Sequence, residues 1–392
     1  MKQQPVRPAA RRHRSARPGN ARRATPIALL LALAAGCSDN GGSGGDVQVP
    51  TSLATQPTSA EPTGTVPTGT GPTGTPRVQV LATGLQVPWG LAFLPDGSAL
   101  VGERPTGRIV KVTSTGTVTE VQRLSDARAT GEGGLLGLAV SPNYATDGLV
   151  YAYYTGDQDN RIVRFKLGGR PEPILTGIHK APIHDGGRLA FGPDGMLYAG
   201  VGDANERPRA QDPAALNGKV LRMTPDGKPA PGNPFPNSVV YSFGHRNVQG
   251  LAWDSAGRLY AAEFGQNRFD EVNLVQAGKN YGWPVVEGNQ ADARFVRPLV
   301  TWPTSECSPS GIAIKGDQLF VAALRGERLW RVPLDGRGGL GEPVPLLQAQ
   351  YGRLRTVALA PDGSLWVTTS NQDGRGGGPA PDDDRILRLT WS

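Results

Sequence analysis

A short apolar motif returns six times between residues 77 and 392, and this repetition limits the fold more than any other feature of the chain. Each copy places an alanine after an apolar residue, continues into a turn of the Pro, Asp and Gly type, and then into a short alternating strand. Two examples are GLAFLPDG, which begins at Gly90, and LAFGPDG, which begins at Leu189. The pattern predicts six β-hairpins. The alanines of the motif are Ala92, Ala139, Ala190, Ala252, Ala313 and Ala358.

A second motif recurs once in each unit and predicts a third strand. Its copies begin at Arg108, Arg161, Lys219, Glu271, Arg328 and Arg385. The alanines of the first motif are 45 to 62 residues apart, close to the length of a four-stranded propeller blade with its loops. We therefore predict an all-β fold, a six-bladed β-propeller with four-stranded blades. A solenoid is the competing repeat architecture, but it would need capping repeats that the sequence does not contain.

The N-terminal side of the repeats predicts how the ring closes. A strand at residues 77–82 precedes the first repeat, whereas the last repeat ends with its third strand. We expect residues 77–82 to complete the last blade, because closure removes the free sheet edges at which proteins aggregate. Residues 77–392 would then form one propeller domain.

Residues 1–36 resemble a bacterial signal peptide. Eight basic residues precede an apolar run at residues 27–35 that is too short to span a membrane. Gly36 and Cys37 then resemble a lipobox, in which the cysteine is acylated; ordinary secretion with cleavage near Ala35 is the alternative. Without those eight residues the 41 basic residues fall to 33, against 34 acidic ones, which argues against nucleic-acid binding. We expect an exported protein, lipid-anchored through Cys37 to the extracytoplasmic side of the bacterial cell membrane.

Two further segments have a biased composition. Residues 37–76 are rich in Gly, Ser, Thr and Pro, which predicts a disordered linker between the lipid anchor and the folded domain. The run Asp382–Asp384 is typical of a solvated loop. Cys307 is the only cysteine besides Cys37, so acylation of Cys37 would exclude an intrachain disulfide.

Propeller geometry selects the candidate functional residues. Loops that enter the first strand of a blade and loops that leave the second strand lie on the same face of a propeller. The candidates are Glu132, His184, Arg246, Asn247, Thr304, Arg353 and Arg355 before first strands, and Asp203, Gly265, Gln266 and Arg325 after second strands. Four of them are arginines, and guanidinium groups around one mouth favour an anionic, planar ligand. Pairing of each arginine with a local Asp or Glu is the alternative.

Several long segments are similar to the glucose/sorbosone dehydrogenase family, whose soluble members are PQQ-dependent aldose sugar dehydrogenases. They are GEGGLLGLA (from Gly131), HDGGRLAFGPDGMLYAGVGD (from His184), GHRNVQGLAW (from Gly244), DEVNLVQAGKNYGWP (from Asp270) and RLRTVALAPDG (from Arg353). The resemblance covers all six repeats. It implies a six-bladed propeller that holds pyrroloquinoline quinone (PQQ), a planar quinone with three carboxylates, together with Ca²⁺.

By position, the resemblance also implies a role for each candidate residue. His184 would take the proton from a sugar hydroxyl while hydride passes to the quinone, Asp203 would orient His184, and Glu132 would line the same pocket. The quinone would be held by Arg246, Asn247, Thr304, Arg325, Arg353 and Arg355. Backbone carbonyls of Gly265 and Gln266 would bind Ca²⁺, and Glu271 and Tyr281 match a second, structural Ca²⁺ site.

Some positions depart from the family pattern. Arg325 stands where soluble members have lysine, Glu132 where glutamine can occur, and Ile183 where an aspartate can precede the histidine. These differences concern substrate choice and quinone affinity more than the fold.

The sequence therefore predicts PQQ-dependent oxidation of an aldose or related sugar, with electrons passed to an unidentified acceptor in the cell envelope. A non-catalytic surface propeller that binds carbohydrate or another ligand is the alternative. A calcium-dependent lactonase on a similar propeller has no specific residues in its support.

Overall fold

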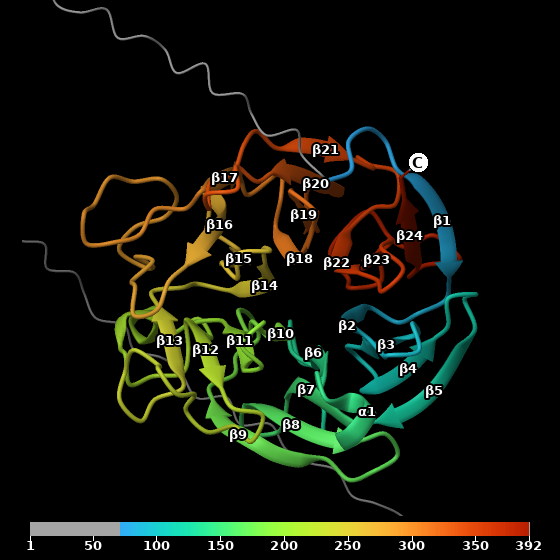
Figure 1. Ribbon diagram of the computed structural model, residues 1–392, viewed down its shortest axis with the longest axis horizontal. Helices are drawn as coiled ribbons and strands as arrows, with labels where there is room; N and C mark the ends of the chain where they lie inside the picture. The colour runs from blue at the N-terminus through green and yellow to red at the C-terminus, as the bar shows by residue number, and fades with distance from the viewer. Residues whose placement is uncertain (1–70, 392) are drawn as a thin grey trace, which may run out of the picture. The chain divides into compact units, whose positions relative to one another are not determined.

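The computed structural model describes residues 71–391, which form six four-stranded antiparallel sheets arranged around a central axis (Figure 1). The strands of blade 1 are β2 (Pro88–Phe93), β3 (Ala99–Glu103), β4 (Arg108–Val112) and β5 (Val118–Arg123). Those of blade 2 are β6 (Leu135–Val140), β7 (Leu149–Thr155), β8 (Asn160–Lys166) and β9 (Glu172–Ile178). Those of blade 3 are β10 (Leu189–Phe191), β11 (Leu197–Val201), β12 (Lys219–Met223) and β13 (Val240–Phe243).

In blades 1 to 5 the strands follow one another in chain order from the axis outwards. The strands of blade 4 are β14 (Val248–Trp253), β15 (Leu259–Glu263), β16 (Phe269–Val275) and β17 (Val300–Pro303). Those of blade 5 are β18 (Pro309–Lys315), β19 (Gln318–Ala323), β20 (Arg328–Pro333) and β21 (Val344–Leu346).

Two short helices, α1 (Tyr144–Asp147) and the 3₁₀-helix η1 (Arg207–Gln211), lie in connections. No helix within residues 71–391 is long and apolar enough to cross a membrane.

Blade 6 joins the two ends of the described chain. Its strands are β22 (Leu354–Leu359), β23 (Leu365–Thr369), β24 (Ile386–Thr390) and β1 (Arg77–Ala82). The outer pair is antiparallel, with Arg77 opposite Thr390, and Figure 1 shows β1 beside β24 at the rim. The predicted closure of the ring by residues 77–82 is confirmed.

The six alanines of the repeat all lie in the innermost strands. In four blades a glycine precedes the apolar residue of the motif, because neighbouring innermost strands approach closely at this position. A Cβ atom on Gly137 would lie 2.1 Å from the carbonyl oxygen of Gly187, and one on Gly250 would lie 2.4 Å from that of Ser310. Any larger side chain there would push two blades apart.

Blades 3 and 6 replace this glycine with Arg188 and Thr356, and these two side chains meet across the centre of the ring. Arg188 donates from Nε to the carbonyl oxygen of Gln249 (2.7 Å) and from Nη2 to Thr356 Oγ1 (3.1 Å). Its guanidinium carbon lies 4.3 Å from the ring centre of Trp89. The Arg188 side chain therefore ties blades 1, 3, 4 and 6 together at the axis.

The start of the described chain and the aspartate run both differ from simple loops. Gly71 N–H donates to Asp317 Oδ1 (2.8 Å), so contacts with blade 5 begin before residue 77.

Asp384 is fully buried and accepts hydrogen bonds from the Thr369 hydroxyl and from the N–H of Val87. The prediction of a solvated loop at Asp382–Asp384 is wrong for the last two residues, because the sequence does not show that these carboxylates cap neighbouring backbone. Residues 1–36, Cys37 and the linker up to residue 70 lie outside the described residues.

Candidate functional site

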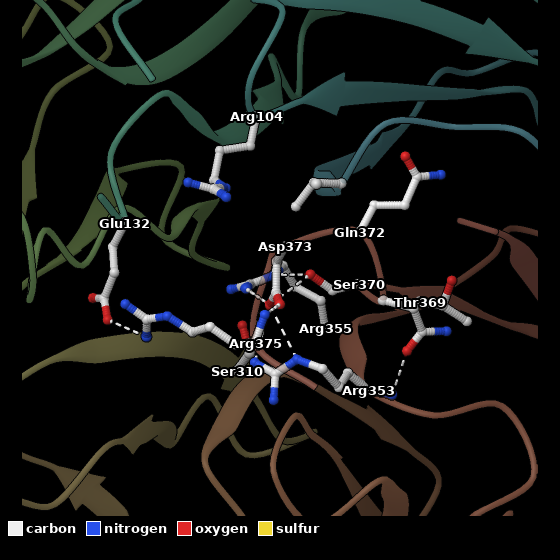
Figure 2. Close-up of polar contacts among 12 residues, drawn as sticks. Arg104, Glu132, Ser310, Arg353, Arg355, Thr369, Ser370, Gln372, Asp373 and Arg375 are labelled. Atoms are coloured by element: carbon white, nitrogen blue, oxygen red, sulfur yellow. Dashed lines mark hydrogen bonds and ion pairs between the residues drawn. The ribbon is translucent and has the colours of Figure 1, made fainter. Parts of the chain in front are cut away.

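A cavity of about 340 Å³ opens where loops of five blades meet. Its walls come from the starts of innermost strands and from the loops that follow second strands, as propeller geometry predicts. The charged residues of the lining are Arg104, Glu132, Arg325, Arg353, Arg355, Asp373 and Arg375. Five are arginines and two are acidic, so the lining carries a surplus of three positive charges. Figure 2 shows the guanidinium groups of Arg104, Arg353, Arg355 and Arg375 gathered around Asp373 and Glu132.

Arg353 and Arg355 share a single carboxylate. Arg353 donates from Nη2 to Asp373 Oδ2 at 2.9 Å, and Arg355 donates from Nη2 to the same oxygen at 3.3 Å. Arg355 also donates to Ser370 Oγ (3.1 Å) and Gln249 Oε1 (3.3 Å). Burial lowers the pKa of Arg355 to about 10, although Asp373 opposes this effect. One carboxylate therefore balances one of the two arginine charges, and the pair keeps a net charge of one.

His184 and Asp203 form a buried pair that does not line the cavity itself and is joined to its lining through Glu132. His184 lies between β9 and β10 in the left-handed region (φ 64°), and its Nδ1 is 2.7 Å from Asp203 Oδ1. Asp203 also accepts from Trp283 Nε1 (2.7 Å) and from the N–H of Asn205 (2.8 Å). Burial alone would raise the pKa of Asp203, but the hydrogen bonds from His184, Trp283 and Asn205 outweigh it and lower the pKa. Asp203 is therefore a fixed, charged acceptor for the imidazole.

Arg246 and Glu132 hold His184 from its other sides. Arg246 Nη2 lies 2.8 Å from His184 Nε2, and the N–H of His184 donates to Glu132 Oε2 at 2.8 Å. A guanidinium can only donate, so His184 Nε2 accepts and the imidazole proton lies on Nδ1, facing Asp203. The other oxygen of Glu132 accepts from Arg375 Nη1 (2.8 Å). Glu132 thus connects the histidine to the lining of the cavity.

The other predicted quinone-binding residues lie at different depths. Asn247 is fully buried and its Oδ1 accepts from the N–H of Gly186 (3.0 Å). Thr304 is half-buried and donates from Oγ1 to the carbonyl oxygen of Asn267 (3.4 Å). Arg325 is exposed and lines the cavity. Arg325, Arg353 and Arg355 therefore reach the cavity wall directly, whereas Arg246 reaches it through His184 and Glu132.

The loop with Gly265 and Gln266 presents backbone oxygens. The N–H of Gly265 donates to Asp270 Oδ1 (2.9 Å), and that of Gln266 donates to Glu287 Oε1 (2.7 Å). Within residues 71–391, no donor reaches the carbonyl oxygen of either residue. Their N–H groups are thus tied to carboxylates while both carbonyl oxygens stay available to a hard cation.

Glu271 and Tyr281 border a smaller hollow together with Glu263. Burial raises the pKa of Glu271 to about 8, and the nearby charge of Glu263 adds to this rise. The Tyr281 hydroxyl donates to the carbonyl oxygen of Leu274 (2.6 Å) and accepts from the N–H of Gln276 (2.8 Å). A cation here would therefore meet carboxylates and the backbone of Tyr281 rather than its phenol. In the described part of the chain, no three His, Cys, Asp or Glu side chains lie together as a metal cluster.

Four residues of the site were not predicted from the sequence. Arg104 follows β3, and Asp373 and Arg375 follow β23, so all three leave second strands and the same geometric rule could have selected them. Trp283, in the connection between β16 and β17, follows a third strand, and the rule does not cover it.

Comparison with known proteins shows the family of this chain. The family model described as Glucose / Sorbosone dehydrogenase matches residues 85–387. This chain belongs to that family. A structure of the PQQ-bound aldose sugar dehydrogenase of Streptomyces coelicolor is 52% identical with a TM-score of 0.77, and the match covers 81% of this chain and 99% of that one.

Two further similar proteins show how far the similarity extends. A structure of a putative glucose dehydrogenase from Thermus is 47% identical, with a TM-score of 0.75, and the match covers 80% of this chain and 100% of that chain. The aldose sugar dehydrogenase of Escherichia coli is 29% identical over 344 residues, which cover 76% of this chain and 91% of the relative. In each case the match spans most of both chains.

Proposed function

We propose that this protein is a PQQ-dependent sugar dehydrogenase that oxidises an aldose or a related sugar. The observation that carries the proposal is the buried His184–Asp203 pair, 2.7 Å apart, which Glu132 joins to a cavity with surplus positive charge. Family membership and the PQQ-bound relative from Streptomyces coelicolor support the enzyme class. The quinone, when bound, accepts the hydride from the sugar carbon.

The residues present fit such a cofactor. The surplus of three positive charges in the lining equals the charge of the three quinone carboxylates. Two donors at the site, Arg104 Nε and Asn247 Nδ2, are buried and have no partner among the described residues. Arg246, Asn247, Thr304, Arg325, Arg353 and Arg355 would hold the quinone, and the carbonyl oxygens of Gly265 and Gln266 would hold Ca²⁺ beside it. Glu271 and Tyr281 would hold the second Ca²⁺, with the carboxylates of Glu271 and Glu263 as the oxygen ligands of the hollow.

His184 is the general base in this proposal. Because Asp203 fixes the proton on Nδ1, Nε2 carries the lone pair that can accept the proton of a sugar hydroxyl. The sugar hydroxyl has to replace the Arg246 donor that occupies Nε2 in this arrangement. Once His184 is protonated, the Asp203 carboxylate stabilises the imidazolium, and Trp283 keeps that carboxylate in place.

A titration followed by a turnover assay tests the proposal. The protein is titrated with PQQ in the presence of Ca²⁺, aldoses are added, and reduction of a dye is followed. We expect quinone binding and sugar-dependent dye reduction, and we expect His184→Ala to bind quinone but lose turnover. His179→Ala, with 47% of its side chain exposed, is the matched control. Absence of quinone binding would leave the alternative of a ligand-binding propeller.

We further propose that the protein is exported, acylated at Cys37 and held at the outer side of the membrane, where its electrons pass to an envelope acceptor. The apolar run before Gly36 and Cys37 supports this placement. Cys37→Ala should move the protein from the membrane fraction to the soluble fraction. Retention of this variant in the membrane fraction would refute the anchor.

A further inference from the structure

Arg104 lines the cavity without a carboxylate partner. It follows β3, and its Nη1 donates to the carbonyl oxygens of Gly131 (2.7 Å) and Gly133 (3.2 Å). Its Nε is buried and has no partner among the described residues, and no Asp or Glu in this part of the chain lies within 4.0 Å of its guanidinium. Figure 2 shows the Arg104 side chain reaching towards the space that Arg353 and Arg355 also face.

The other charges of the lining show why Arg104 needs an anion. Arg375 is balanced by Glu132, and Asp373 balances one charge of the Arg353 and Arg355 pair. Arg325 is exposed, so water can solvate it. Arg104 has neither a carboxylate at ion-pair distance among the described residues nor full access to water. Burial lowers the pKa of its guanidinium, although the more distant charges of Asp373 and Glu132 oppose this effect. A half-buried cation with an unused, buried donor is stabilised by an anion that brings acceptors to it.

We propose that Arg104 is a further cofactor-binding residue, whose guanidinium pairs with one carboxylate of the quinone. This inference rests on the proposed function, because the quinone supplies the anion. It adds a contact from blade 1 to those expected from blades 3 to 6. The contacts to Gly131 and Gly133 set the guanidinium in place before the ligand arrives, so little side-chain entropy is lost on binding.

Quinone affinity, rather than turnover, tests this role. Full-length wild-type protein and the Arg104→Gln variant are titrated with PQQ in the presence of Ca²⁺, with tryptophan fluorescence as the readout. We expect Arg104→Gln to bind PQQ at least about tenfold more weakly, because a charge-assisted contact is lost. Arg104→Lys keeps the charge and should recover part of the affinity. Arg123→Gln, an exposed arginine of the same blade, is the matched control and should bind like wild type.

The trimethyl ester of PQQ separates the charge of Arg104 from its contacts with the Gly131–Gly133 loop. The ester has no carboxylates, so wild type and Arg104→Gln should not differ in their affinity for it. An equal loss with the acid and the ester would show that Arg104 acts through its loop, and this would overturn the inference. PQQ affinity of Arg104→Gln within threefold of wild type would also overturn it. If wild type itself binds no PQQ, the proposed function falls as well.

Discussion

Replacement of Asp203 by asparagine tests the geometry of the proposed base most directly. The carboxylate accepts three hydrogen bonds of 2.7 to 2.8 Å, from His184, Trp283 and the backbone of Asn205. An asparagine amide group has to face a donor in either orientation. With its nitrogen towards Trp283, two N–H groups oppose each other. With its nitrogen towards His184, the imidazole must carry its proton on Nε2 and can no longer act as a base.

The magnitude follows from these contacts. Loss of a charged acceptor costs about 1.5–3 kcal/mol, and loss of the general base removes about 10²- to 10⁴-fold in rate. We therefore expect Asp203→Asn to lower kcat about 10²- to 10⁴-fold, while quinone affinity stays within about threefold of wild type, since Asp203 does not line the cavity.

The assay needs saturating sugar, PQQ and Ca²⁺, with quinone occupancy measured separately by absorbance. Asp157→Asn, at an aspartate with 66% of its side chain exposed, is the matched control and should keep wild-type kcat. A fully occupied Asp203→Asn protein with kcat within fivefold of wild type would refute the assignment of His184 as a base oriented by Asp203.

Three further predictions concern stability and folding. Burial raises the pKa of Asp185 from 3.8 to about 6, so its favourable contribution is present below pH 3.8 and is lost as the pH rises through 6. Asp185→Asn should therefore stabilise the protein by roughly 1–2 kcal/mol at pH 8 and much less at pH 4. Denaturant unfolding measures this, and an equal change in the free energy of unfolding at pH 4 and pH 8 would contradict it. Gly137→Ala should destabilise by at least about 2 kcal/mol, because its Cβ would lie 2.1 Å from Gly187 O, whereas Gly377→Ala, with no atom within 4 Å, should leave the melting temperature unchanged. A chain that begins at residue 83 lacks β1 and should aggregate through the exposed edge of β24, whereas a chain that begins at residue 71 should fold. Circular dichroism and size-exclusion chromatography compare the two chains. If the shorter chain is folded and soluble, β1 is not needed to close the ring.

The number of blades could be predicted from the sequence because each blade repeats the same short sequence motif. Ala92 and its five counterparts follow an apolar residue and precede a turn, and this pattern alone places them in innermost strands. Closure by β1 could be predicted because an unpaired strand remained at each end of the repeats. Local patterns suffice here, since strand pairing within a blade joins segments that are near neighbours in sequence.

The composition of the candidate site was only partly predictable. His184, Asp203 and Glu132 could be selected by their loops, and the structure brings them into direct contact. The sequence did not show that Arg353 and Arg355 share Asp373, or that Arg246 covers His184 Nε2. Whether two such side chains touch depends on how the loops fold over the axis, and no local sequence pattern describes that folding.

The sequence by itself thus determined the number of blades, the register of their inner strands and the loops that carry polar residues. Tertiary structure decided which charges meet. Strand register depends on the local alternation of side chains, which is written in each repeat. Charge pairing depends on ring closure, which brings Arg375 to Glu132 across 243 residues of sequence and leaves Arg104 Nε without a hydrogen-bond partner among residues 71–391.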